Sequence, residues 1–261
     1  MTAVTLSRSP RTPRALDWWA RLVSIPLFLG VWQLIVHLEL VNPVLFPPPT
    51  VVAQSLWDYA SNGPMGQDVG WSLLRVTVGY LAGAAAGILV GLLTGTSRIV
   101  SGLFTPIFQM LRPIPPIAFV PIVIVWFGLT EWGKFFLVFW GVFFTVWLAA
   151  HLGVQRANET FIRAAQCLGA RPRNVLLEVQ LPASLPVIFV GLRTAVGISF
   201  YTLVAAELAG AYAGVAYRLE VVQHNMQIGH MMAGLVLLGL ISATADWLFS
   251  IVSKRVVHWS A

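Results

Sequence analysis

The segment Gly128–Lys134 has the spacing of a phosphate-binding loop. It reads Gly-Leu-Thr-Glu-Trp-Gly-Lys and so matches the first seven positions of the P-loop motif. The motif next needs Ser or Thr to hold magnesium, and Phe135 occupies that position. Trp132 is too bulky for a loop that wraps around phosphate. We therefore interpret the match as a coincidence, and we predict no ATPase site in this chain.

Other residue types that could perform catalysis are scattered along the chain. The histidines have no paired metal-ligand spacing, and the ten carboxylates do not cluster. No Gly-x-Ser-x-Gly segment is present. The single cysteine, Cys167, excludes an intramolecular disulfide bond. The sequence thus predicts no catalytic residue, no metal site and no cofactor held by this chain, so we expect a protein that is not itself an enzyme.

Three charged residues, Arg112, Arg193 and Glu207, fall within otherwise apolar stretches. Charges inside a membrane are costly, and they usually face a pathway or a partner. They are therefore candidates for a translocation path. The alternative is that the two arginines pair with Asp246, with Glu207 or with free backbone carbonyls and fix the helix register.

The composition identifies the solvent around these residues. Hydrophobic residues make up 57% of the 261 residues and charged residues only 10%, whereas soluble domains average about 25% charged residues. So few charges cannot solvate the surface of a globule, and lipid must cover most of it. The net charge of +6 would suit nucleic acid, but its distribution fits a membrane face instead, and we predict no nucleic-acid partner.

Six stretches are long and apolar enough to cross about 30 Å of hydrocarbon as helices. Their predicted ranges are about 22–40, 72–97, 99–128, 133–155, 182–207 and 230–253. The third is interrupted by five prolines, at positions 106, 113, 115, 116 and 121. We expect an all-α polytopic membrane protein with six transmembrane helices and a single transmembrane domain over residues 22–255.

Lys and Arg residues are distributed unequally between the two sides of these spans. If the chain starts inside the cell, eleven of the sixteen fall in inner segments and two in outer segments. This bias predicts that both termini are cytoplasmic, as residues 1–21 and 256–261. It also makes the 156–181 connection an inner loop.

Glycine recurs every four residues in the second predicted span. The positions are Gly79, Gly83, Gly87, Gly91 and Gly95. This spacing places them on one stripe of a helix, where the absence of side chains lets another backbone approach closely. We expect the stripe to pack helices within the chain or between subunits, with a direct role in the transport path as the alternative.

The inner loop 156–181 has the pattern of two short helices. Phe161–Leu168 reads as an amphipathic helix that Gly169 can end, and Pro172 can begin a second helix. The segment is predicted to project from the membrane as a helix–turn–helix. The alternative is a helix pair that lies on anionic lipid.

This loop resembles the "EAA" signature of binding-protein-dependent ABC importer permeases, Glu-Ala-Ala-x3-Gly-x9-Ile-x-Leu-Pro. Every spacing agrees, and Arg163 and Val179 replace the Glu and the Ile. Stretches that begin at Leu45, Arg112, Ile124 and Leu203 are similar to the nitrate/taurine/alkanesulfonate-type permeases. The resemblance implies that the loop couples to an ATPase through Arg163, Ala164, Ala165, Gly169, Ala170, Val179, Leu181 and Pro182.

The resemblance also implies the fold and the partners. The fold would be the type I ABC importer permease arrangement, in a bacterial inner membrane. The partners would be a second copy of the chain, two cytoplasmic subunits that bind ATP and magnesium, an extracytoplasmic solute-binding protein and membrane lipid. A sulfonate such as taurine is the first choice of solute; nitrate, bicarbonate and aromatic or heterocyclic acids are alternatives. A stand-alone secondary carrier is the alternative class of function.

Overall fold

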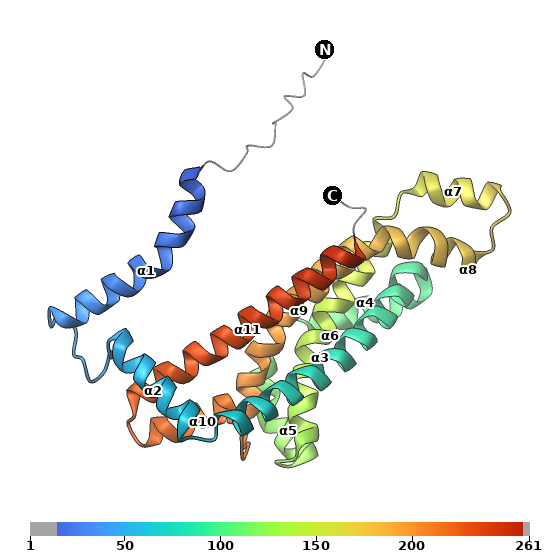
Figure 1. Ribbon diagram of the computed structural model, residues 1–261. Coiled ribbons are helices and arrows are strands. Elements are labelled where there is room, and N and C mark those ends of the chain that lie inside the picture. Colours follow the sequence, from blue (N-terminus) through green and yellow to red (C-terminus); the bar gives the residue numbers. More distant parts are fainter. Residues whose placement is uncertain (1–14, 258–261) are drawn as a thin grey trace.

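The computed structural model describes residues 15–257, with side chains described from residue 23 onward. All regular structure in this range is helical, as predicted, and consists of long helices with shorter ones at both ends (Figure 1). The predicted cytoplasmic segments 1–21 and 256–261 fall mainly outside the described residues, because residues 1–14 and 258–261 are not among them.

Four helices of the described chain have the length and hydropathy of membrane spans. They are α3 (Met65–Thr96), α6 (Glu131–Gln155), α11 (Ile228–Val256) and a continuous helix, Pro172–Leu208, whose last part is α9 (Leu181–Leu208). A fifth span is formed if α4 (Arg98–Leu111) and Pro116–Phe127, which meet at 88°, cross together. The described apolar part of α1 (Ala15–His37) is the shorter segment Val23–His37. The sixth span therefore stays a prediction.

Shorter helices lie at both ends of the bundle. At one end are α2 (Pro49–Ser61), η1 (Pro116–Phe119) with α5 (Val120–Phe127), and α10 (Val215–His224). At the other end are α7 (Glu159–Cys167), α8 (Pro172–Asn174) and the π-helical segment η2 (Val175–Gln180), near the end of α11 (Figure 1). We call the end with α7 and α8 the loop end, and the end with α10 the α10 end.

The glycine stripe of α3 faces α6 along its whole length. A Cβ atom added to Gly79, Gly83, Gly87, Gly91 or Gly95 would come within 2.5–3.0 Å of the nearest atom of α6. For Gly87 the nearest atoms include the backbone oxygen of Phe143 at 2.9 Å. Lipid provides no hydrophobic reason for helices to associate, so close van der Waals contact of this kind holds the pair together.

Another side of α6 packs against α9. A Cβ added to Gly153 of α6 would lie 3.1 Å from the Cβ of Ser184 on α9. Val142, which faces the glycine stripe, and Leu203 of α9 are completely buried in the same core. α6 is thus the central helix of a three-helix layer, and the residues placed on α3 and α9 are held at fixed distances by it.

Prolines break the third predicted span into α4 and the η1–α5 piece. Pro113 and Pro115 lack the N–H group that would bond to the carbonyl four residues earlier, and α4 ends at Leu111. Pro116 begins the next piece, at a position where a missing N–H group costs nothing. The backbone turns sharply between the two pieces, and Arg112 lies at this turn.

Gly87→Ala should destabilise the bundle, because the new methyl group meets α6 backbone that cannot move independently. We expect a loss of about 1–3 kcal/mol, the usual cost of overpacking. Gly70→Ala on the same helix is the matched control, since a Cβ there meets nothing within 4 Å. Thermal unfolding of the detergent-solubilised chain measures both; equal midpoints for the two variants would contradict the packing role of the stripe.

Candidate functional site: the coupling loop and the charged residues of the bundle

The 156–181 loop folds into a helix–turn–helix at the loop end. The side chain of Asn158 caps α7 by accepting a hydrogen bond from the Thr160 backbone N–H at 2.9 Å. Gly169 follows α7 with a φ of +81°, a left-handed conformation that glycine adopts without steric cost. Pro172 opens the next helix in its first turn. Because α8, η2 and α9 continue as one helix of 37 residues, the second half of the loop and a candidate membrane span are one element.

The outer surface of α7 is open in the single chain. No residue of α7 is buried, and the apolar side chains of Phe161 and Leu168 are 63% and 89% exposed. Arg163, at the position of the signature's glutamate, pairs with Glu159 on the same helix at 2.6 Å. Ala164 is exposed, whereas Ala165, Ala170, Val179, Leu181 and Pro182 are half-buried. The exposed apolar residues make α7 suitable for contact with another protein.

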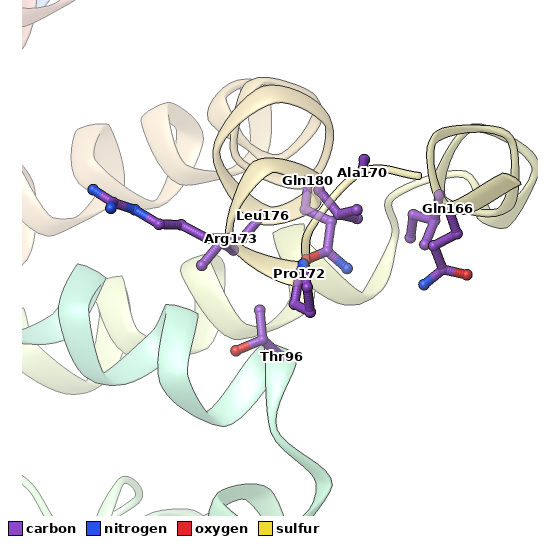
Figure 2. Close-up of a pocket in the computed structure, with 9 residues that line it drawn as sticks. Thr96, Gln166, Ala170, Pro172, Arg173, Leu176 and Gln180 are labelled. Carbon is purple, nitrogen blue, oxygen red and sulfur yellow. The ribbon is translucent and has the colours of Figure 1, made fainter. Parts of the chain in front are cut away.

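A hollow of about 470 Å³ lies beneath the loop. Thr96 at the end of α3, Gln166 on α7, and Leu176 and Gln180 on η2 approach it from different sides (Figure 2). The hollow separates α7 from the membrane-spanning helices, so that α7 is held mainly through its turn and η2.

The α10 end contains a buried network of charged side chains. Arg75 on α3 is only 1% exposed, and it donates to Glu207 of α9 at 2.9 Å and to Glu131 of α6 at 2.7 and 2.9 Å. Glu131 also accepts from Lys134 at 2.9 Å. The network therefore ties together the three helices of the central layer where they reach the α10 end.

A third carboxylate, Asp68, lies at the same end of the bundle and bonds to the short helices. Asp68 accepts hydrogen bonds from the Tyr59 hydroxyl at 2.7 Å, the Arg218 guanidinium at 2.9 Å and the Gly214 backbone N–H at 2.9 Å. Burial raises the pKa of Tyr59, and the hydrogen bond to Asp68 raises it further, so the phenol remains a donor. These bonds join α2, α3 and α10.

Glu207 belongs to this closed network. Its side chain is fully buried, and it accepts hydrogen bonds from Arg75, Ser72 and the backbone N–H of Ala216. Gly214, with a φ of +140°, packs directly on the Glu207 carboxylate, where a Cβ has no room. Glu207 thus has its partners on α3 and α10, and neither Arg112 nor Arg193 is among them.

The sequence analysis missed the importance of Arg75 and Asp68. Arg75 served only as the edge of an apolar stretch, and Asp68 was not singled out. The signal available was the position of Arg75 between Leu74 and Val76, just inside an apolar run. A charge there needs a partner, but the sequence does not identify which of the ten carboxylates supplies it.

The two arginines within the spans differ in their surroundings. Arg193 forms a two-pronged pair with Asp246, at 2.9 and 2.7 Å, and so joins α9 to α11. This is one of the partners that the alternative interpretation names. Arg112 is exposed at the α4–η1 turn, and it makes no side-chain hydrogen bond or ion pair with any residue that the structure describes. The structure therefore separates the two arginines instead of placing them in one relay.

Between residues 15 and 257, no group of three or more His, Cys, Asp or Glu side chains is arranged to hold a metal ion. Two features of the described chain stand out instead. One is the projecting loop that is continuous with a long span, and the other is the set of charges inside the bundle. The fold is that of a helical membrane bundle with a helix–turn–helix at one end.

The chain belongs to the family described as the binding-protein-dependent transport system inner membrane component, whose model matches residues 83–258. It is therefore the permease of an ABC importer, an integral membrane protein. A chain of the MetNI methionine ABC transporter, solved in inward-facing conformations, shares the fold. Its TM-score is 0.58 at 18% identity, and the match covers 80% of this chain and 95% of that one.

Its curated relatives are permeases as well. The chain is 33% identical to the taurine transport system permease protein TauC of Escherichia coli, over 90% of this chain and 88% of the relative. It is 28% identical to the putative aliphatic sulfonates transport permease protein SsuC of Bacillus subtilis, over 93% and 88%. The nitrate import permease protein NrtB of Leptolyngbya laminosa is 31% identical, over 90% and 86%.

Arg75→Met should destabilise the chain by about 3–5 kcal/mol, because it leaves the buried Glu207 charge without its partner. Arg163→Met is the control: it removes an equally short ion pair, but one with both side chains more than 75% exposed, and such pairs contribute at most about 1 kcal/mol. Thermal unfolding in detergent measures both variants.

Adding Glu207→Gln to Arg75→Met should recover part of the lost stability, because the buried charge is removed together with its partner. A double variant less stable than Arg75→Met alone would show that Glu207 is held by its other hydrogen bonds and not by Arg75.

Proposed function

We propose that the chain forms the translocation path for a small solute that carries an oxyanion group, with a sulfonate such as taurine as the first choice. The observation that carries this proposal is the similarity to permeases named for taurine, aliphatic sulfonates and nitrate, which extends over about nine-tenths of the chain. Nitrate, bicarbonate and aromatic or heterocyclic acids remain the alternatives. An extracytoplasmic binding protein delivers the solute.

The ATP-binding subunits are separate proteins that bind ATP and magnesium, and the 156–181 loop engages them. The contact residues are Arg163, Ala164, Ala165, Gly169, Ala170, Val179, Leu181 and Pro182. In support, α7 presents apolar side chains that nothing in the single chain covers, and the loop is continuous with α9. When the ATPases close, they pull α7, and the long helix carries this displacement into the bundle.

A second copy of the chain completes the path. In support, the most apolar part of α11 has no buried residue in the single chain, although it is long enough to cross the membrane. Lipid covers part of such a surface, and a second copy covers the rest. Two copies also match the two ATPase subunits that a symmetric importer requires.

Both termini lie in the cytoplasm, and α1 supplies the sixth span. A helix of 23 residues is about 35 Å long and can cross the hydrocarbon core. The positive-inside rule supports this orientation, because Arg156, Arg163, Arg171 and Arg173 belong to the loop end. At the α10 end, by contrast, Lys134 and Arg218 are paired with carboxylates. The membrane is the inner membrane of a bacterium.

Transport should be measured with the chain, its ATPase subunit and its binding protein reconstituted together in liposomes. We expect uptake of radiolabelled taurine that requires ATP and the binding protein. Competition with unlabelled nitrate, bicarbonate and aromatic acids ranks the alternatives. Uptake driven by an ion gradient without the ATPase would instead identify a secondary carrier.

Gly169→Val should abolish the response of ATP hydrolysis to the binding protein. A β-branched residue at a φ of +81° is strained, so the turn between α7 and α8 must change shape. Gly169→Asn is the matched control, because Asn tolerates this conformation, and it should keep most of the uptake. Membrane insertion should be normal for both, since Gly169 lies outside the spans. Near-normal uptake by Gly169→Val would contradict the coupling role of the loop.

A further inference from the structure

A pocket of about 280 Å³ lies at the bend between α4 and η1. Its walls come from three parts of the chain: Arg112 and Pro116 at the bend, Trp140 and Thr145 on α6, and Tyr201 and Thr202 on α9. Gly141 forms part of the α6 wall, where a Cβ would lie 2.6 Å from the Thr202 methyl carbon. The volume is just below the roughly 300 Å³ at which small-molecule sites begin, so the pocket suits a solute of a few heavy atoms.

The pocket lies deep in the bundle. Gly141 is ten residues into α6 from the α10 end, and Thr202 is six residues from the end of α9. At 1.5 Å per residue these positions are about 15 Å and 9 Å from the α10 end. A hydrocarbon core of about 30 Å places the pocket between the membrane centre and that end.

Arg112 is the charged group of this pocket. Three other cations inside the bundle have carboxylate partners: Arg75 and Lys134 pair with Glu131, and Arg193 pairs with Asp246. No Asp or Glu lines the pocket, and Arg112 forms no ion pair with any of the residues described. A guanidinium at this depth requires a negative partner, and the nearby protein does not supply one.

The rest of the lining adds hydrogen-bond donors but no negative charge. The indole Nε1 of Trp140 is buried and donates to no described residue, and a buried donor without an acceptor is unfavourable. Tyr201 is 64% exposed, and its hydroxyl has no partner in the described part of the chain. Ile114, Phe144 and Ile198 supply apolar walls. A pocket with one cationic side chain, further hydrogen-bond donors and apolar walls suits a small anion that has a hydrophobic part.

We propose that this pocket binds the oxyanion group of the transported solute during its passage, with Arg112 as the charge partner and Trp140 and Tyr201 as donors. The identification of the anion as the transported solute rests on the proposed function. Arg193 is not part of the site, because its charge is already neutralised by Asp246. Glu207, in the closed network at the α10 end, does not contact the solute in this state.

The test measures the charge preference of a thiol placed in the pocket. Ile198→Cys is introduced with Cys167→Ser in the assembled complex, and it is labelled with sulfonatoethyl methanethiosulfonate, an anion, or with its trimethylammonium analogue, a cation. The labelling rate with the anionic reagent is divided by the rate with the cationic reagent. The thiol's own reactivity affects both rates equally, so it does not affect this ratio. The native Cys167, exposed in the single chain and labelled in the permease without its ATPase subunits, provides the ratio at a site outside the pocket.

We expect the anionic reagent to be favoured at Ile198→Cys, and Arg112→Gln to lower the ratio by about tenfold or more, since a nearby charge acts on the two reagents with opposite sign. Arg112→Lys should keep most of the preference, and Arg193→Gln should leave it unchanged. Taurine or nitrate should slow the labelling. A ratio that Arg112→Gln leaves unaltered would overturn the proposal.

A second pair of variants decides the question if Arg112→Gln does not assemble. Tyr201→Phe removes one donor and retains the ring, and Trp140→Phe removes the other donor and replaces the indole with a smaller aromatic ring. We expect severalfold less taurine uptake per ATP hydrolysed, while the binding protein still stimulates ATP hydrolysis. Unchanged uptake per ATP would refute the site.

The two experiments distinguish the anion site from the proposed function. If the complex transports taurine but the labelling ratio is the same with Arg112 and with Gln at this position, the anion site is wrong and the proposed function is retained. If Arg112→Gln lowers the ratio but the complex transports no oxyanion, the proposed function is wrong and the anion site is retained.

Discussion

A charge inside a membrane must find a partner of opposite sign, and this constraint organises the structure. At the α10 end it is satisfied within the chain: Arg75 bridges Glu207 and Glu131, and Asp68 accepts hydrogen bonds from α2 and from the start of α10. Because each of these groups is anchored by the others, the ends of α2, α3, α6, α9 and α10 are fixed together. At the α4–η1 bend no residue between 23 and 257 pairs with Arg112, and this unpaired cation is the basis of the proposed anion site.

The central layer of α3, α6 and α9 gives these charges their fixed positions. Lipid does not drive apolar helices together, so the layer depends on small residues that let backbones touch. The glycine stripe performs this function between α3 and α6, and Gly153 and Gly191 perform it between α6 and α9. A shift of α9 relative to α6 would therefore alter both the pocket, whose walls come from these two helices, and the charged network at the α10 end.

One helix connects all three regions. The continuous helix Pro172–Leu208 begins in the 156–181 loop, provides Tyr201 and Thr202 to the pocket, and carries Glu207 next to its end. It is also tied to α11 by the Arg193–Asp246 pair. Under the proposed function, a pull on α7 would reach the pocket and the α10 end along this helix. The π-helical segment η2 is the last part of the loop, at a position where a change in helical winding would alter the transmission.

The sequence by itself determined the class of protein and the local structure. Composition required lipid as the solvent, the run lengths defined most spans, and the five prolines predicted the interruption of the third span. The Gly169 and Pro172 positions predicted the helix–turn–helix, because each residue has a conformation that other residues do not share. These are short-range properties, and they can be read from residue type and spacing.

Only the tertiary structure decided which charges meet. Arg75, Arg112 and Arg193 look alike in sequence, since each lies in an apolar stretch without a near neighbour of opposite sign. Their partners, where they have them, are 53 to 132 residues away along the chain. The helical bundle buries Arg75 among carboxylates, pairs Arg193 with Asp246 and leaves Arg112 at the edge of a pocket. The reason is physical: an ion pair in lipid depends on which helix faces pack together, and that packing is set by the small residues of several helices at once.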